Sequence, residues 1–210
     1  MAIRHLIFDL GNVLIDLDFT ATERQLRQLL GSHYTASFTC NEQQGLFEAF
    51  EKGLISEAEF FFQLRHWAQG AVSVEMLKEA WNAMLLRFPI ERLEWISQLR
   101  TRYGTYVLSN TNETHLRWVH QHLAKQYGIA QYEQRYFDQV WYSHHLHLRK
   151  PELEIFQYVL DTANLPASQT LFVDDNPDNV AAAAQLGIVA VHHPPGHELK
   201  QTLAPFLELQ

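Results

Sequence analysis

The stretch Ile7-Phe8-Asp9-Leu10-Gly11-Asn12-Val13 decides the fold, because an apolar run stops at a carboxylate and a Gly-Asn turn follows at once. A buried parallel strand reads as a continuous apolar run, so the residues up to Phe8 are predicted to form such a strand. Open α/β sheets bind ligands just beyond the carboxyl ends of their strands. Asp9 is therefore a candidate nucleophile or metal ligand. Taken alone, the pattern is also typical of a strand whose last Asp caps the following turn.

Three further segments place polar residues at the ends of predicted elements. Residues 106–112 form a second apolar strand that ends in Ser109-Asn110-Thr111-Asn112. Residues 148–152 put Lys150 just before a proline suited to the first turn of a helix. Residues 170–179 form a third apolar strand that ends in the pair Asp174-Asp175. The four motifs together are far more specific than any one of them.

In the order Asp, Ser-Asn, Lys and Asp-Asp, these motifs resemble the haloacid dehalogenase-like (HAD) superfamily of hydrolases, and the resemblance spans the chain. The Asp-Leu-Gly-Asn-Val form of the first motif looks like the branch that contains bacterial α-D-glucose-1-phosphate phosphatases. More distantly, it is similar to the phosphatase domain of soluble epoxide hydrolase. The resemblance implies a phosphoric monoester hydrolase that depends on magnesium and acts on a small phosphorylated metabolite.

Composition agrees with a cytoplasmic enzyme of this kind. The 210 residues, of which 47% are hydrophobic, can bury a sizeable core in one domain or in a domain with an insert. The net charge of -8 and the lack of a basic run argue against nucleic acid as a partner. Cys40 is the only cysteine, as expected in a reducing compartment. The first apolar stretch is cut by Asp9, Asp16 and Asp18, so it does not read as a signal peptide or membrane span.

The predicted architecture is α/β, with a Rossmann-like parallel sheet core formed by residues 1–18 and 89–210. Residues 19–88 show helical periodicity and are predicted to form an inserted helical cap. Within the cap, one helix stops at Gly53, and Ser56 with Glu59 forms a capping box that opens the next. The elements expected later are helices at 92–101, 112–126, 152–162 and 179–186, and strands at 105–109, 139–142, 170–174 and 188–191. In the superfamily, a cap at this place covers the active site and selects small substrates.

The residue types at these strand ends fit phosphoryl transfer. A carboxylate such as Asp9 can attack phosphorus and form an aspartyl phosphate, which splits one difficult displacement into two easier ones. Because the phosphoryl group and Asp9 are both negative, a divalent cation must screen them, and Mg²⁺ prefers oxygen ligands. By resemblance, the metal ligands are the Asp9 side chain, the main-chain carbonyl of Gly11 and Asp175. Asp174 is expected to hold a metal-bound water or Lys150, and Asn179 to steady the loop.

The resemblance also implies how the substrate is held. Ser109 and Asn110 are expected to contact the phosphate oxygens through the hydroxyl, the amide and backbone N–H groups. Lys150 would supply a fixed positive charge near both the nucleophile and the phosphate, which makes it a catalytic and a substrate-binding residue. Outside this context, Ser109-Asn110 reads as an ordinary turn and Lys150 as a solvated lysine.

The chain departs from the family pattern at Gly11. Phosphatases of this superfamily usually carry Asp two residues after the nucleophile, as general acid for the leaving oxygen and then base for the attacking water. General acid–base help is typically worth about 10² to 10⁴ in rate, so its loss should slow the enzyme without abolishing turnover. A more acidic leaving group would need less protonation, which favours an anomeric sugar phosphate such as glucose 1-phosphate. Asp16, Asp18 or a cap side chain could instead supply the proton.

Two other functions compete with the phosphatase. The 2-haloacid dehalogenases also lack the second Asp and carry Ser-Asn in the second motif, but they use no metal. The Asp174-Asp175 pair separates the two, because a metal-free site has no use for extra carboxylates whose repulsion raises their pKa values. A non-catalytic regulatory or binding protein on the same fold is the third possibility. The oligomeric state is left open between monomer and dimer.

The sequence contains two groups of histidines that could suggest a metal site. His144, His145 and His147 precede a loop, and a second group, His192, His193 and His197, flanks a Pro-Pro-Gly sequence. Their mixed spacing does not match a zinc site, so they are expected to play other roles.

Overall fold

The computed structural model of the chain describes all residues except 1, 32–33, 35–44, 69–71 and 208–210. Cys40 therefore lies outside the described residues. The strands of the main sheet are β1 (His5–Phe8), β4 (Gly104–Ser109), β5 (Gln139–Tyr142), β6 (Thr170–Asp174) and β7 (Val189–His192). They are all parallel and lie in the order β5-β4-β1-β6-β7. The predicted α/β fold with a parallel sheet is confirmed.

β1 is the central strand of the sheet, and its apolar residues suit that position. Leu6, Ile7 and Phe8 are all buried, so β1 tolerates a neighbouring strand on both edges and a helical layer on both faces. The register pairs Phe8 with Val107 of β4 and with Val173 of β6. As a result, the residues that follow these three strands meet at one edge of the sheet.

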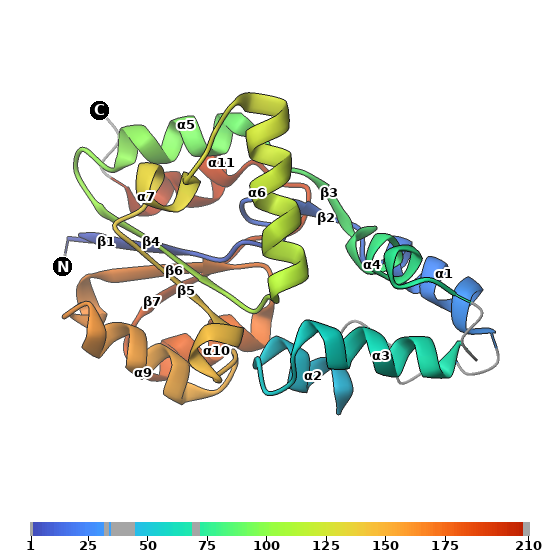
Figure 1. Cartoon of the computed structure of the whole chain (residues 1–210). Helices are drawn as coiled ribbons and strands as arrows, with labels where there is room; N and C mark the ends of the chain where they lie inside the picture. Colours follow the sequence, from blue (N-terminus) through green and yellow to red (C-terminus); the bar gives the residue numbers. More distant parts are fainter. Residues whose placement is uncertain (1, 32–33, 35–44, 69–71, 208–210) are drawn as a thin grey trace.

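Helices cover both faces of the sheet (Figure 1). One face packs against helices α5, α6, α7 and α11, whose buried residues join Leu6, Phe8 and Val107 in one apolar cluster. The other face packs against α9 and α10, which cluster with Ile7 and Leu108. The bounds of the helices in this part of the chain are α5 (Ile90–Leu99), α6 (Glu113–Tyr127), α7 (Tyr132–Tyr136), α8 (Ser143–Leu146), α9 (Leu153–Thr162), α10 (Pro177–Gln185) and α11 (Leu199–Leu203), with short 3₁₀ turns at Ala167–Gln169 and Ala204–Phe206.

A second group of helices lies beyond the carboxyl ends of the strands (Figure 1). These are α1 (Phe19–Leu30), α2 (Leu46–Glu51), α3 (Glu57–Trp67) and α4 (Val74–Asn82). Their apolar side chains, rich in phenylalanine, form a hydrophobic cluster separate from those of the sheet. This arrangement is what a helical cap over the strand ends requires, and the boundaries of the cap at residues 19 and 88 stay a prediction.

Two short strands link this helical group to the sheet. β2 (Asp16–Leu17) and β3 (Leu85–Arg87) pair antiparallel, with a bulge between Asp16 and Leu17. The sequence predicted only helices between residues 19 and 88, so β3 was missed. A strand of three residues is too short to show the alternation that marks a strand, and it is stabilised by pairing with residues far away in the sequence.

Local sequence signals set several helix ends. The predicted capping box is present, because Ser56 Oγ accepts the N–H of Glu59 at 3.2 Å and Glu59 Oε2 accepts the N–H of Ser56 at 2.8 Å. Pro151 was expected in the first turn of a helix, yet α9 begins only at Leu153, so the proline lies in the loop before it. None of the described helices has the length and apolar character that crossing a membrane would require.

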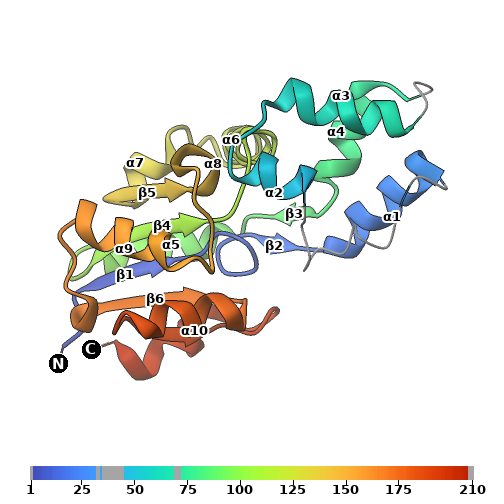
Figure 2. The same ribbon diagram turned by 90° about the horizontal axis from the view of Figure 1, so that it is seen from below.

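Gly53 follows the end of α2 and lies close to the backbone of His144 in α8. Its backbone lies in the left-handed region, with φ of 63°, which favours glycine. A Cβ atom at this position would overlap the carbonyl oxygen of His144. The absence of a side chain therefore lets α2 come against α8, and Figure 2 shows the two helices side by side.

Candidate active site

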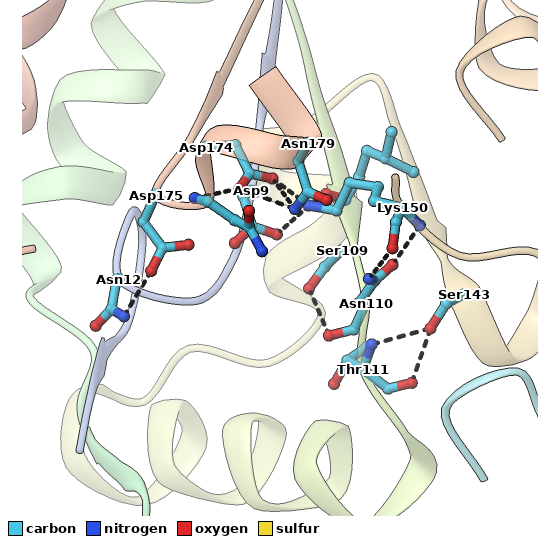
Figure 3. Close-up of polar contacts among 12 residues, drawn as sticks. Asp9, Asn12, Ser109, Asn110, Thr111, Ser143, Lys150, Asp174, Asp175 and Asn179 are labelled. Carbon is cyan, nitrogen blue, oxygen red and sulfur yellow. Dashed lines mark hydrogen bonds and ion pairs between the residues drawn. The ribbon is translucent and has the colours of Figure 1, made fainter. Parts of the chain in front are cut away.

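Asp9 lies directly beyond β1, where it contacts a buried lysine. Lys150 Nζ donates to Asp9 Oδ1 at 2.6 Å, to Asp174 Oδ2 at 2.5 Å and to the carbonyl of Leu108 at 2.9 Å. Lys150 is 1% exposed, Asp174 is fully buried and Asp9 is 7% exposed. The ammonium group is thus held between two carboxylates from neighbouring strands, as Figure 3 shows.

Asp174 has its oxygens fully engaged by the protein. Oδ1 accepts the N–H of Asn176 at 2.8 Å, and the Asn179 amide donates to Oδ1 and Oδ2 at 3.0 and 3.1 Å. Together with Lys150, these donors occupy the lone pairs of the carboxylate. Asp174 thus contacts both Lys150 and Asn179, and the roles predicted for Asp174 and Asn179 stay predictions.

Asp175 is oriented by a residue that sequence reasoning treated only as part of a turn. Asn12 Nδ2 donates to Asp175 Oδ2 at 2.7 Å, and Asn12 Oδ1 accepts the N–H of Leu17 at 3.1 Å. Asn12 has a positive φ of 52°, a conformation that asparagine tolerates better than most residues. Asn12, in the turn after β1, therefore positions the carboxylate of Asp175, which follows β6.

The second motif organises the loop that carries Lys150. The Asn110 side chain donates to the carbonyl of Lys150 at 2.8 Å and accepts its N–H at 2.9 Å. Ser109 Oγ makes only a long contact of 3.4 Å, to the carbonyl of Asn110. The Asn110 amide donates one of its two hydrogens to the Lys150 backbone, so its predicted contact with phosphate would use the other and stays a prediction. The Ser109 hydroxyl and the backbone N–H groups stay predicted phosphate contacts as well.

The electrostatics of the site call for additional positive charge. Burial, opposed by Lys150 and reinforced by Asp174 and Asp175, raises the pKa of Asp9 to about 7. Burial also raises the pKa of Asp175, although the hydrogen bond from Asn12 works against it. Burial alone would lower the pKa of Lys150, but the charges of Asp174 and Asp9 outweigh it and raise that pKa. Three ionised carboxylates and one ammonium leave two negative charges, which matches one divalent cation.

The donor set fits such a cation. Oxygen atoms of Asp9, Asp174 and Asp175 lie within 4.8 Å of one another, the one group of at least three potential ligands found among the described residues. Since Asp174 is engaged by Lys150 and Asn179, Asp9 and Asp175 are the carboxylates with lone pairs to offer. Carboxylate oxygens are the ligands that Mg²⁺ prefers.

A cavity of about 140 Å³ opens beside these residues. It is smaller than the roughly 300 to 1,000 Å³ of sites that hold drug-sized ligands, so it suits a small molecule. Its polar wall brings together six predicted site residues, Asp9, Ser109, Asn110, Lys150, Asp175 and Asn179. Its apolar wall consists of Leu10, Ile15, Leu17, Phe19, Met84, Leu85 and Val119. Two charged residues that sequence reasoning missed, Glu51 and Arg149, also line it.

Gly11 lines the cavity as well, next to Asp9. Its φ is outside the left-handed region, so the backbone there does not require glycine. A Cβ atom at Gly11 would lie 2.8 Å from Leu17 Cδ1 and 3.6 Å from Asp9 Oδ2. Leu17 Cδ1 is the end of a flexible side chain, so a new side chain at position 11 would displace it modestly. The new side chain would lie next to the Asp9 carboxylate.

Two of the suggested replacements for the missing acid are engaged elsewhere. Asp16 forms ion pairs with Arg87 at 2.7 Å and Arg92 at 2.8 Å. Asp18 caps α1 by accepting the N–H of Thr20 at 3.0 Å. Neither aspartate is among the described residues that line the cavity. Of the described residues that line the cavity, Glu51 is the one carboxylate of the helical group.

Four of the six histidines considered as metal ligands form hydrogen bonds with other parts of the protein. His144 Nδ1 bonds the carbonyl of Thr111 at 3.1 Å, and His147 Nδ1 bonds that of Lys52 at 2.8 Å. His192 Nε2 bonds the carbonyl of Asp175 at 3.0 Å, and His193 Nδ1 contacts Thr202 Oγ1 at 2.8 Å. No histidine belongs to the potential metal cluster found among the described residues.

Comparisons with known proteins agree with this geometry. Residues 3–187 match a family model described as haloacid dehalogenase-like hydrolase. The D-ribitol-5-phosphate phosphatase of Bacteroides thetaiotaomicron is 28% identical over 205 residues, which cover 98% of both chains. The crystal structure of a HAD family enzyme from the same organism, in complex with magnesium and inorganic phosphate, is 32% identical. It superposes with a TM-score of 0.85 over 94% of this chain and 97% of that one. A predicted HAD-like hydrolase from Porphyromonas gingivalis is 28% identical, with a TM-score of 0.89 over the full length of both chains.

Proposed function

Since the chain belongs to the haloacid dehalogenase-like hydrolase family, we propose that it is a magnesium-dependent phosphatase that hydrolyses a small phosphomonoester. The observation that carries this proposal is the arrangement of Asp9, Lys150, Asp174 and Asp175 around one small cavity. A nucleophilic carboxylate, a fixed cation and a pair of carboxylates able to bind a metal are what phosphoryl transfer through an aspartyl phosphate requires. The phosphatase and the magnesium-phosphate complex among its relatives support the same activity.

In the first step, an Asp9 oxygen attacks phosphorus, the bond to the leaving oxygen breaks, and that oxygen takes a proton from solvent water to leave as the alcohol. In the second step, water attacks the aspartyl phosphate and releases inorganic phosphate, which restores the Asp9 carboxylate. Lys150 stays protonated throughout and balances the charge on the phosphoryl oxygens. Ser109 and the backbone N–H groups after it contact those oxygens. Asp9, Asp175 and the Gly11 carbonyl would hold Mg²⁺, which supplies charge neutralisation and orients the phosphoryl group.

We further propose that the substrate is a small phosphorylated metabolite of the sugar or sugar-alcohol class. The small cavity and the ribitol-5-phosphate phosphatase among the relatives support this class. The acidic net charge of -8 disfavours nucleic acid as a partner, and the single cysteine fits a cytoplasmic location.

The direct test is release of inorganic phosphate by the purified chain from a panel of sugar phosphates, sugar-alcohol phosphates and phenyl phosphate, with and without Mg²⁺. We expect Mg²⁺-dependent turnover of the phenyl ester and of at least one hydroxylated ester. A parallel assay measures halide release from 2-chloropropionate. Halide release without any phosphate release would replace the phosphatase with a dehalogenase, and the absence of both would favour a binding protein.

Gly11 leads to a second expected result. Without a carboxyl two residues after Asp9, kcat for a series of substituted phenyl phosphates should rise steeply with the acidity of the phenol. Gly11→Asp should flatten that dependence, because a new carboxyl near Asp9 can protonate poor leaving groups. The gain for the poorest of them should reach up to about 10² to 10⁴ if the carboxyl is well placed.

The matched control for this substitution is Gly11→Asn, which adds a side chain of the same size without an acid. Circular dichroism and thermal melting verify that both variants fold. If the wild-type kcat is insensitive to the leaving group while single-turnover kinetics show that chemistry limits the rate, another residue supplies the proton. Glu51 would then be the first residue to examine.

A further inference from the structure

Glu51 and Arg149 come from two different parts of the chain and form an ion pair in the wall of the cavity. Glu51 is the last residue of α2, and Arg149 immediately precedes Lys150. Arg149 Nη2 lies 3.2 Å from Glu51 Oε2, and both residues line the cavity that contains Asp9. The cavity thus contains an ion pair that plays no part in the attack on phosphorus.

Both members of the pair lie in the cavity wall and keep part of their side chains accessible. The Glu51 side chain is 11% exposed and that of Arg149 is 23% exposed, so water reaches them poorly. Arg149 Nε is buried and has no hydrogen-bond partner among the described residues. Because water does not reach Nε, a molecule in the cavity would meet the exposed part of the Arg149 side chain and not this atom.

The position of Glu51 is fixed by several contacts with the sheet part of the molecule. Ser143 Oγ donates to the carbonyl of Glu51 at 2.6 Å and also receives the N–H of Thr111 at 3.0 Å. The next residue, Lys52, forms an ion pair with Glu152 at 2.5 Å. The close approach at Gly53 completes the contact. The Glu51 carboxylate is therefore held at a defined place relative to Asp9 and Lys150.

We propose that Glu51 and Arg149 bind hydroxyl groups of the leaving group and thereby select polyhydroxylated phosphate esters. The proposal rests on the phosphatase function and specifies its substrate class. A hydroxyl can donate to the carboxylate and accept from the guanidinium at the same time, so it satisfies both members of the pair.

Other leaving groups fit this pair less well. A second phosphate would be attracted by Arg149 and repelled by Glu51. A protonated amine would be attracted by Glu51 and repelled by Arg149. An apolar group would exclude water from the pair without replacing its hydrogen bonds. Hydroxyl groups of a sugar or sugar alcohol avoid each of these penalties.

The test compares Glu51→Gln with Glu48→Gln, a matched control on the same helix. Glu48 pairs with Lys52 at 3.0 Å and is not one of the described residues lining the cavity. The two substrates are D-ribitol 5-phosphate, which carries four free hydroxyls, and phenyl phosphate, which carries none. Both are assayed with the full chain in saturating Mg²⁺, and kcat and KM are determined separately.

We expect Glu51→Gln to lower kcat/KM for D-ribitol 5-phosphate about ten- to a hundredfold more than for phenyl phosphate, as for a lost hydrogen bond to a charged group. The change should lie mainly in KM, and Glu48→Gln should retain the wild-type constants for both substrates. Arg149→Lys, which keeps the charge but loses the planar fork, should show a smaller loss with the same selectivity. It serves as the second variant should Glu51→Gln fail to fold.

Several outcomes would overturn the proposal. An equal loss for both substrates would mean that Glu51 only seats α2 against the sheet part. A fall in kcat with unchanged KM would assign Glu51 to proton transfer. Wild-type turnover of phenyl phosphate without turnover of D-ribitol 5-phosphate, glycerol 3-phosphate or glucose 1-phosphate would refute the substrate class alone. Failure to hydrolyse any phosphate ester would instead refute the phosphatase function on which the proposal rests.

Discussion

Replacing Asp9 by Asn is expected to lower phosphate release to below about a hundredth of the wild-type rate, because the isosteric amide cannot attack phosphorus. The amide has nearly the shape of the carboxylate and can still accept a hydrogen bond from Lys150. Lys150 also keeps its contacts with Asp174 and with the Leu108 carbonyl. The variant should therefore fold, which circular dichroism and a melting curve would verify.

Asp18→Asn is the control for this experiment, since Asp18 caps α1 and is not among the described residues that line the cavity. Its rate should stay within about twofold of wild type, as for most surface substitutions. Mass spectrometry of wild-type protein quenched during turnover should find the phosphoryl group on a peptide that contains Asp9. Activity of Asp9→Asn above about a hundredth of wild type in a contamination-free preparation would contradict the covalent mechanism.

Removal of Mg²⁺ should have an effect of similar size. Excess chelator is expected to reduce turnover to below about a hundredth, and added Mg²⁺ should restore it, because the carboxylates of the site then repel both one another and the phosphate. Asp175→Ala removes one expected ligand and the hydrogen-bond partner of Asn12. This variant should need far more Mg²⁺ than wild type or remain inactive.

The matched control is Asp178→Ala, because Asp178 lies in the first turn of α10, is exposed and is not among the described residues that line the cavity. The Mg²⁺ concentration for half-maximal activity, measured for both variants, separates loss of a ligand from a general change in charge. Full activity of wild type in excess chelator would exclude the metal-dependent mechanism and revive the dehalogenase. Unchanged Mg²⁺ dependence in Asp175→Ala would assign the ion to other ligands.

Much of the fold and the candidate site could be predicted because each motif is a local pattern. An apolar run that ends in a polar residue identifies a buried strand and its carboxyl end without knowledge of any contact. Once the strands are parallel and adjacent, the residues after β1, β4 and β6 must lie together. The family inferred from those motifs is confirmed by the match over residues 3–187.

The remaining features depend on contacts between residues distant in sequence, for which a single sequence contains no signal. Asn12 and Asp175 are 163 positions apart, and Ser143 and Glu51 are 92 apart. The pairing of β2 with β3 also joins distant segments. Glu51 and Arg149 read as ordinary solvated charges on a helix end and a loop, so their shared cavity could be found only from the three-dimensional arrangement.

The surroundings of Lys150 restrict the reactions open to this site. Its three ammonium hydrogens are donated to Asp9, to Asp174 and to the carbonyl of Leu108, and its pKa is raised by the two carboxylates. Condensation with an aldehyde or ketone requires a neutral amine with a free lone pair. Deprotonation of Lys150 would leave two buried carboxylates without their counter-ion. Lys150 therefore does not form an imine with a substrate. Lyase or aldolase reactions that proceed through a lysine adduct do not occur at this residue.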